Sequence, residues 1–598
     1  MAAVSEEPLA SDRPSVDETP SPPRPKVWRS FSVHAAALAA LLLVLVPLFD
    51  DGWVASPDEG VYSAQAANLA DGSWASPRPA RDVDVDGEFD GLTGAFVRDG
   101  EHVPYSRHPA YPLVLAPFYA LAGTTGLVLV SALGTWVAAV AAAVIARRFS
   151  ERFALPTLWL VGIGSPLLFD AYVVIGHALA AALCGTLFVL LAKALEGPRW
   201  RWTVAVLPCA VLLSLMRSEG AVVVVATGAA LAATAIRFRP HDRARIAVAP
   251  LGQVALGVGV AAAGALAFLA DDRWSDLITG TTGTGSGSVD RDSNLLAAAW
   301  SDLLQPWHGS ALTASSSAAI AVLAPTLGAL ALRLQPKRTL LPLALVGMGA
   351  IAAVVRLVES PVLISGLAAA FPALVVGLLL LPGDVLAEPI GRVAALAAAL
   401  SGVAILATSY GEGGTTQWGG RFFHVLLPIV VPLAVVGLDA GRRRLRRPEV
   451  AVAAAAVLVL TAAFSALSLR ANSAYRGLSR RTVVGTMDEA RSRPSTEAGG
   501  SLVVVSPLNA SGAGRAFWKQ VTDGHPILSS EGLGTLHGIL EDAEAAGRRE
   551  VLVVTDREPE MISFLLGSTL RRLDWAVQDA RRIEGTPNWT MWIGEEPI

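Results

Sequence analysis

The chain has 598 residues, of which 53% are hydrophobic and only 16% are charged. Soluble proteins carry about 25% charged residues, so this composition indicates a polytopic membrane protein. The net charge of -4 is small and no residue spacing marks a nucleic-acid-binding module, so we expect no nucleic-acid partner. Cys184 and Cys209 both lie in apolar runs, which argues against a disulfide framework or a thiolate metal site.

The N-terminal segment, residues 1–30, is rich in proline, serine and acidic side chains, and we expect it to be disordered. The next run, Phe31 to Phe49, is long enough to cross a roughly 30 Å hydrocarbon core as a helix. Basic residues flank its N-terminal side, which places that end in the cytoplasm by the positive-inside rule.

Further apolar runs bring the expected total to about thirteen spans. They lie near residues 124–146, 153–169, 172–194, 202–216, 220–236, 246–269, 318–334, 339–355, 362–381, 392–408, 421–438 and 450–469. Arginines gather at every second junction, and an odd number of spans puts the C-terminal region outside the cytoplasm. The apolar segment from His108 to Gly123 contains three prolines, and counting it as a span would break the arginine pattern. We therefore expect a re-entrant or interfacial helix there.

Three long regions are expected outside the membrane bundle of residues 31–470. The loop 50–108 is dense in acidic residues, and the loop 271–317 contains the tract "GTTGTGSGS". No Gly-Lys-Ser/Thr closes that tract, so it reads as a mobile loop rather than a P-loop. The tail, residues 471–598, alternates short β-branched runs with helix-like stretches, which predicts a small extracytoplasmic α/β domain.

The candidate catalytic residues are Asp58 and Glu59, which follow Pro57 shortly after the first apolar run. Two interpretations stay open for them. The carboxylates can complement the dipole at the start of a helix that lies along the interface. Alternatively, a carboxylate at the membrane surface can act as general base on an acceptor hydroxyl or bind a divalent cation.

Other polar residues lie at the expected outer ends of the spans. Tyr105, Arg107 and His108 precede the proline-broken helix, where interfacial anchoring is the alternative to a site role. Asp170 and His177 are seven residues apart, and ionisable groups at such depth usually face a cavity. A lone histidine is nevertheless more often a packing residue than a catalyst.

Two junctions combine an arginine with other polar residues. The first is "MRSEG", with Arg217 and Glu219. The second is "QWGGRFFHVLLP", with Gln417, Trp418, Arg421 and His424. A guanidinium group at the outer face suits a lipid phosphate, because it donates two parallel hydrogen bonds. An Arg217–Glu219 ion pair is the competing interpretation, whereas no acid follows Arg421 within four residues.

In this order, "PDEGVY", "YSRHPAYPLVLAPFYAL", "RSEG" and "QWGGRFFHVLLP" resemble a GT-C glycosyltransferase of the kind that uses polyprenyl-phosphate sugars. Protein mannosyltransferases and the aminoarabinose transferases of lipid A belong to that kind, and the resemblance covers residues 31 to about 470. It implies that Asp58 is the catalytic carboxylate and that an arginine, here Arg421, steadies the leaving phosphate. Many relatives place a second acid at the outer end of the fourth span, where this chain has "VIGHALA" with His177, and Asp170 is the nearest acid.

The expected function is inverting transfer of a sugar from a polyprenyl-phosphate carrier to an extracytoplasmic acceptor, which could be a cell-envelope glycan, a lipid or a protein. Asp58 would remove the acceptor's proton while Arg421 and Arg217 stabilise the leaving phosphate. Metal use stays open. A flippase for lipid-linked substrates would instead place polar residues and broken helices near mid-membrane, often as repeated halves. A non-catalytic scaffold with the same fold is the third class.

Overall fold

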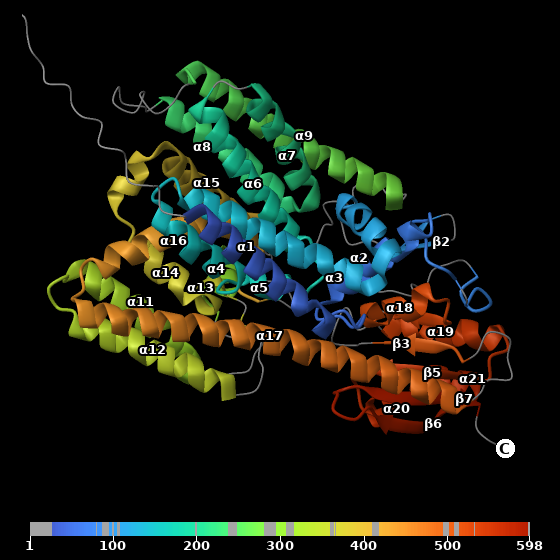
Figure 1. Cartoon of the computed structure of the whole chain (residues 1–598). Helices are drawn as coiled ribbons and strands as arrows, with labels where there is room; N and C mark the ends of the chain where they lie inside the picture. The colour runs from blue at the N-terminus through green and yellow to red at the C-terminus, as the bar shows by residue number, and fades with distance from the viewer. Residues whose placement is uncertain are drawn as a thin grey trace, which may run out of the picture.

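The computed structural model describes residues 27–78, 80–85, 95–98, 101–104, 108–197, 200–236, 248–279, 295–305, 316–358, 364, 366–408, 418–493, 501–506, 514–530 and 533–595. Long apolar helices form a bundle, and a small mixed sheet lies beyond one end of it (Figure 1). The α-helices of the bundle are α1 (Val27–Val44), α3 (Ala110–Ala146), α4 (Ala154–Gly162), α5 (Leu167–Asp170), α6 (His177–Glu196), α7 (Trp200–Met216), α8 (Ser218–Ile236), α9 (Pro250–Thr279), α10 (Leu295–Ala299), α11 (Ser316–Leu334), α12 (Leu340–Val358), α13 (Leu367–Ala370), α14 (Pro372–Leu379), α15 (Pro389–Thr408), α16 (Leu427–Arg442) and α17 (Arg447–Ser492). Short helical turns join them: η1 (Val46–Leu48), η2 (Glu151–Phe153), η4 (Trp300–Leu304), η5 (Gly383–Ala387) and η6 (Arg421–Leu426).

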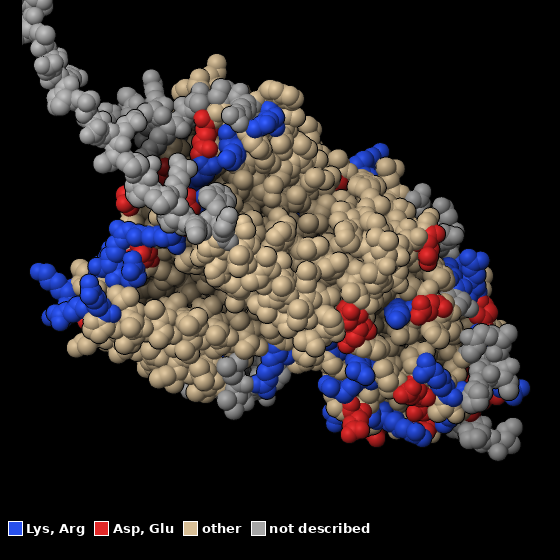
Figure 2. All heavy atoms as spheres, in the orientation of Figure 1, with Lys and Arg blue, Asp and Glu red and all other residues tan. Residues whose placement is uncertain are grey.

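Eight helices in the described part of the chain are long and apolar enough to cross a membrane. The other expected spans fall on helices outside these eight, such as α7, α11 and α12, or on helices broken in two, as in α4 with α5 and α13 with α14. The total of about thirteen spans therefore stays a prediction. On the face seen in Figure 2, an almost uncharged band separates a basic end from the charged sheet domain. This build is that of a multi-pass membrane protein.

Helix α3 is bent at Gly123, where the backbone has φ 58° and ψ -139°. Glycine adopts a positive φ at little cost, so it divides α3 into a proline-containing first arm and a long second arm. The first arm is the segment expected as a re-entrant or interfacial helix. It packs against α2 (Pro57–Ala70) of the loop 50–108, where Tyr62 and Tyr111 meet edge to face at 5.0 Å between ring centres.

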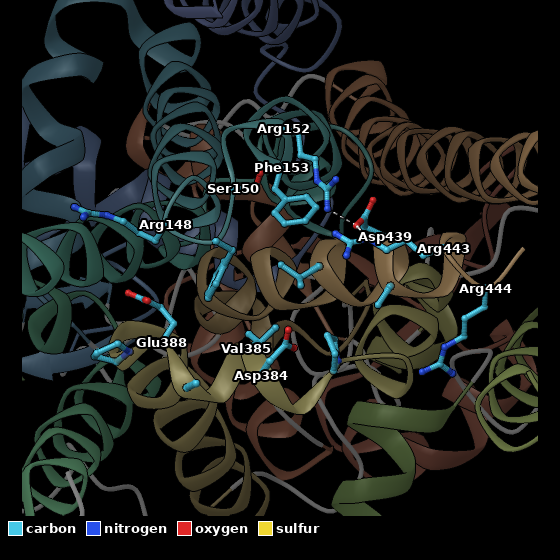
Figure 3. Close-up of a pocket in the computed structure, with 16 residues that line it drawn as sticks. Arg148, Ser150, Arg152, Phe153, Asp384, Val385, Glu388, Asp439, Arg443 and Arg444 are labelled. Carbon is cyan, nitrogen blue, oxygen red and sulfur yellow. Dashed lines mark hydrogen bonds and ion pairs between the residues drawn. The ribbon is translucent and has the colours of Figure 1, made fainter. Parts of the chain in front are cut away.

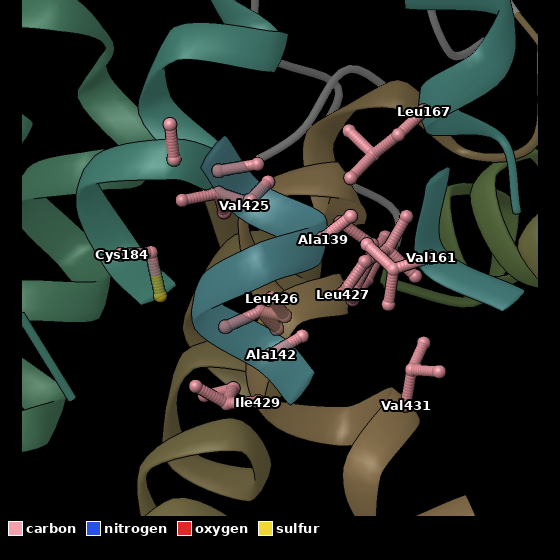
Figure 4. Close-up of a cluster of buried hydrophobic side chains, with 14 of the residues drawn as sticks. Ala139, Ala142, Val161, Leu167, Cys184, Val425, Leu426, Leu427, Ile429 and Val431 are labelled. Carbon is pink, nitrogen blue, oxygen red and sulfur yellow. The ribbon is translucent and has the colours of Figure 1, made fainter. Parts of the chain in front are cut away.

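The centre of the bundle is a close-packed apolar cluster beneath η6. Ala139 and Ala142 of α3, Cys184 of α6, and Leu426 and Leu427 at the η6–α16 junction all contribute to it (Figure 4). Small side chains on α3 let the neighbouring helices approach closely, as is usual for helices packed in membranes. This packing fixes the start of α16, and with it the position of Arg421.

Helix α17 joins the bundle to the C-terminal domain without interruption. Its 46 residues span roughly 69 Å at about 1.5 Å per residue. It lies along α12 in the bundle and then beside the sheet, where Val483 and Met487 enter the domain's core (Figure 1). The helix passes through residue 471, where the sequence suggested a domain boundary, and the first strand of the sheet begins at Val503.

The C-terminal domain has a five-stranded mixed sheet in the order β4-β3-β5-β7-β6. Its elements are β3 (Val503–Val505), η7 (Gly514–Phe517), α18 (Trp518–Thr522), β4 (Ile527–Ser529), α19 (Leu533–Ala545), β5 (Glu550–Thr555), α20 (Pro559–Leu565), α21 (Gly567–Leu573), β6 (Trp575–Arg582) and β7 (Trp589–Glu595). Strand β3 lies between β4 and β5 and runs parallel to both, and Val504 pairs with Leu528 and Val553. Strands β5, β7 and β6 are antiparallel. The small α/β domain expected from the short β-branched runs is confirmed.

The described part of the loop 50–108 packs on this domain. Besides α2 it contains a hairpin, β1 (Ala95–Arg98) with β2 (Glu101–Pro104). Ala80 and Val83 are buried in the domain's core, and Asp82 pairs with Arg548 at 2.7 Å. The indole Nε1 of Trp518 donates to the carbonyl oxygen of Gly52 at 3.1 Å. The loop and the domain thus form one layer over the end of the bundle.

Candidate functional site

Asp58 lies in the first turn of α2 between two arginines from distant parts of the chain. Its Oδ2 is 3.2 Å from Nη1 of Arg421, at the start of η6, and its Oδ1 is 3.2 Å from Nη1 of Arg515, in η7 of the C-terminal domain. The Asp58 side chain is 28% exposed. The structure therefore joins the loop 50–108, the bundle and the C-terminal domain at one carboxylate.

The charges around Asp58 decide its protonation state. Burial alone would raise its pKa, but the positive charges of Arg421, Arg515 and Arg217 outweigh burial and hold the pKa below its usual value. Asp58 is accordingly ionised at neutral pH. While both arginines hold it, the carboxylate is also a weaker base than a free aspartate, because a proton would have to displace these charges.

Arg421 is aimed by an unusual backbone turn. The two glycines before it both have positive φ, 66° and 62°. A Cβ on Gly420 would lie 2.2 Å from the carbonyl oxygen of Asp302, so a larger residue does not fit. Trp418 anchors the turn from the other side: it is 2% exposed and stacks on Phe169 at 6.2 Å. These "WGG" residues fix the direction in which Arg421 leaves the bundle.

One donor of the Arg421 guanidinium is left unpaired by the residues that the structure describes. Its Nε is buried and has no hydrogen-bond partner among the residues that the structure describes. Buried donors are nearly always paired, so an orphaned N–H beside an ion pair marks a place where a further acceptor fits.

Glu59 faces away from Asp58 and is only 2% exposed. One oxygen accepts from the backbone N–H of Ala55 at 2.8 Å, and the other accepts from that of Val174 at 3.1 Å and lies 2.5 Å from Nη2 of Arg476. Its oxygens are therefore occupied by partners on the loop, the bundle and α17. In this arrangement Glu59 positions α2 against the bundle.

The "RSEG" junction forms the ion pair that was one of the two interpretations. Arg217 binds Glu219 through two contacts, Nε–Oε2 at 3.1 Å and Nη2–Oε1 at 3.2 Å. The side chains of both residues are about nine-tenths buried. The positive charge of Arg217 nevertheless contributes to the low pKa of Asp58.

His108 lies next to this pair, with its backbone in the left-handed region at φ 52°. Its Nε2 accepts from the backbone N–H of Ser218 at 3.2 Å, so the ring proton of the neutral form is on Nδ1 and faces Oδ2 of Asp271 at 2.9 Å. A non-glycine residue with positive φ is uncommon and often occurs at functional sites. His108 links the start of α3 to α8 and α9.

A buried layer supports the glycine turn. His424 has Nδ1 2.5 Å from Oδ2 of Asp170, and its Nε2 donates to the carbonyl oxygen of Gly419 at 3.0 Å. The His177 ring is 5.9 Å from the His424 ring, between centroids. Asp170 ends α5 and His177 begins α6, so they do not share the face of one continuous helix. His424 brings them to the same turn.

Tyr105, Arg107 and Gln417 lie outside the described residues. Sequence reasoning missed Arg515, Arg476 and Asp271. Arg515 follows small residues in "GAGR", as Arg421 does in "WGGR". This similarity is the one local signal that could have identified Arg515. For Arg476 and Asp271 we find no such signal, because each lies inside a helix and its importance comes from its partner.

The donor set does not fit a divalent cation at Asp58. Both carboxylate oxygens face guanidinium groups, which repel a cation. Within the described residues there is also no group of three or more His, Cys, Asp or Glu that could hold a metal ion. The arrangement instead suits an anion, since guanidinium groups recognise carboxylate and phosphate oxygens.

A cavity of about 940 Å³ is lined by Asp439 and neighbouring residues (Figure 3). Asp439 lies near the end of α16, whereas Arg421 begins the preceding η6, so the cavity is at the opposite end of the bundle from Asp58. Arg148, Arg152, Asp384 and Arg443 are among its lining residues. Asp439 pairs with Arg152 at 2.7 Å and with Arg443 at 3.0 Å. These arginines are committed to a protein carboxylate, on the side that the arginine pattern assigns to the cytoplasm.

No protein-family model matches the chain, and no curated protein sequence matches it. Among solved structures, it is similar to ArnT from Cupriavidus metallidurans bound to undecaprenyl phosphate, with 13% identity, a TM-score of 0.47, and coverage of 94% of this chain and 98% of that chain. It is also similar to ArnT from the same organism in the apo state, with 13% identity, a TM-score of 0.49, and coverage of 95% and 98%. At TM-scores under 0.5, neither similarity assigns an activity or a ligand to this chain.

Proposed function

We propose that this protein is a glycosyltransferase that moves a sugar from a polyprenyl-phosphate carrier to an acceptor hydroxyl outside the cytoplasm. One observation carries the proposal: a carboxylate and a guanidinium group are held 3.2 Å apart at one end of an apolar bundle. A lipid-borne phosphate would arrive at this level of the membrane, next to a base that can serve the acceptor.

The proposed step is a single inverting displacement. The acceptor oxygen attacks the anomeric carbon of the sugar, the bond from that carbon to the phosphate oxygen breaks, and polyprenyl phosphate leaves with the electron pair. The acceptor's proton goes to Asp58. Negative charge grows on the phosphate as the bond breaks, and Arg421 is placed to stabilise it. A lipid-linked donor needs no nucleotide-binding motif.

The other site residues have supporting roles in this proposal. Glu59 holds α2 through Arg476, and His424 with Asp170 holds the turn before Arg421. Arg217 adds positive charge near Asp58 while it stays paired with Glu219. A transporter would have its binding site near the bilayer midplane. The charged cluster around Asp58 instead lies where the bundle meets the C-terminal domain, which favours the transferase.

The decisive experiment measures sugar transfer by purified wild-type and Asp58→Asn protein with a panel of polyprenyl-phosphate sugars. Release of polyprenyl phosphate is the readout, because it is common to every donor of this class. We expect turnover by the wild type and none by Asp58→Asn. Asp71→Asn is the matched control, since Asp71 caps the other end of α2 and is exposed. Turnover retained by Asp58→Asn would remove Asp58 from the mechanism.

A further inference from the structure

Arg515 reaches the candidate base from a different domain, and its backbone is fixed against α2. A Cβ built on Gly60 would lie 2.0 Å from the carbonyl oxygen of Arg515, so this glycine permits contact between α2 and η7. The residues after Arg515 are anchors: Phe517 is fully buried, and Trp518 is 1% exposed and bonded to the loop at Gly52. The guanidinium is therefore presented to Asp58 by a rigid attachment.

Two guanidinium groups share the Asp58 carboxylate, and the neighbouring Arg217 is paired with Glu219. Within the described residues, the buried Nε of Arg421 has no hydrogen-bond partner. The donor's phosphate is a phosphodiester, which carries one negative charge on two non-bridging oxygens and can bridge two guanidinium groups as a carboxylate does. Its charge grows as polyprenyl phosphate leaves, so the same two groups hold the leaving phosphate more strongly.

Asp58 and a phosphate would compete for the same donors. Each oxygen of Asp58 faces one arginine, in the manner of a bound anion bridging two guanidinium groups. An arriving phosphate cannot engage both Nη1 groups until the carboxylate gives them up. The arrangement seen here is therefore a resting state in which the protein supplies its own anion.

We propose that Arg421 and Arg515 together form the binding site for the phosphate of the lipid-linked donor, and that Asp58 occupies this site until the phosphate displaces it. The inference rests on the proposed function and adds to it a second phosphate-binding residue, supplied by the C-terminal domain. That domain then completes the active site.

Displacement of Asp58 has a chemical consequence. The two arginines are main causes of its low pKa, and a phosphate that neutralises them lets the pKa rise. Asp58 becomes a stronger base only when the donor is in place. Donor binding thus precedes proton removal. The same event places the leaving phosphate on the arginines and makes Asp58 a stronger base.

The test measures binding of undecaprenyl phosphate to the full-length protein in nanodiscs, without turnover. Arg515→Gln should weaken binding by about tenfold or more, the loss of one charge-assisted contact. Arg515→Lys should recover part of the lost affinity, because lysine keeps the positive charge but lacks the two parallel N–H donors of arginine. Asp58→Asn should tighten binding severalfold, because it removes the competing anion. Arg571→Gln, an exposed arginine of the same domain, is the control and should bind as the wild type.

The opposite response of Asp58→Asn and Arg515→Gln separates this inference from a loss of folding, which would weaken binding in both. Unchanged binding in Arg515→Gln, weaker binding in Asp58→Asn, or no binding by the wild type would each overturn it. The proposed function is tested separately. If the protein binds undecaprenyl phosphate through Arg515 but transfers no sugar, the phosphate site stands and the proposed transferase activity is wrong. If the wild type transfers sugar but Arg515→Gln binds undecaprenyl phosphate as tightly as the wild type, the proposed function stands and this inference is wrong.

Discussion

The buried pair of Glu59 and Arg476 should dominate the stability of the junction between loop, bundle and α17. Their side chains are 2% and 5% exposed, and the contact distance is 2.5 Å. Arg476→Met removes the charge but keeps much of the volume, leaving Glu59 buried with only the backbone N–H groups of Ala55 and Val174. Breaking such a pair from one side costs about 3–5 kcal/mol, roughly two to four powers of ten in the unfolding equilibrium constant.

Unfolding in a graded detergent series, followed by accessibility of a buried cysteine, measures this cost. Arg480→Met is the matched control, an exposed arginine on the same helix four residues further on, and should change stability by less than about 0.5 kcal/mol. The double variant Glu59→Gln with Arg476→Met should lose less than the sum of the two single changes, because no charge is left buried and unpaired. Glu59→Gln that leaves stability intact but abolishes turnover would show that Glu59 is catalytic and refute the positioning role.

Three further predictions address the site and the topology. Arg421→Lys should lower turnover substantially and Arg421→Ala should lower it further, because lysine keeps the charge without the paired donors; unchanged kinetics in Arg421→Ala would move the donor site to Arg217 or Arg107. Gly420→Ala should lose activity and melt at a lower temperature, since its φ is 62° and the new methyl group would lie 2.2 Å from the carbonyl oxygen of Asp302; an equally active and stable variant would contradict this geometry. Cysteines at the exposed positions Ser73 and Ser568 should both react with an impermeant thiol reagent in intact cells, and labelling of only one would contradict the arginine-based topology.

The helical architecture could be predicted from sequence because apolar runs of sufficient length are local signals. The length of the last long helix could not. The apolar part of α17 ends near residue 469, but the helix continues to Ser492 through a polar stretch. Alanine and arginine are good helix formers whether or not they lie in lipid, so the end of an apolar run marks the membrane edge and not the end of the helix. The short strands of the tail were recognisable because β-branched runs of this length favour strands.

Residues of the candidate site could be predicted only where a local sequence pattern fixes the direction of a side chain. The glycines before Arg421 are such a pattern, since they mark a turn whatever lies around it. The pair Asp58-Glu59 looks like two carboxylates for one reaction, yet successive residues of a helix point about 100° apart and cannot share a partner. One therefore meets Arg421 and Arg515, and the other meets Arg476.

Arg515 shows why the rest of the site could not be found along the chain. Its contact with Asp58 joins residues 457 positions apart and depends on how the C-terminal domain rests on α2. That docking is set by buried contacts of the loop and by the close approach at Gly60, which no periodicity in the sequence describes. If the two arginines bind one phosphate, donor affinity depends on how the domain is docked on the bundle. A variant that loosens their docking without touching Asp58 should then lose donor affinity as Arg515→Gln does.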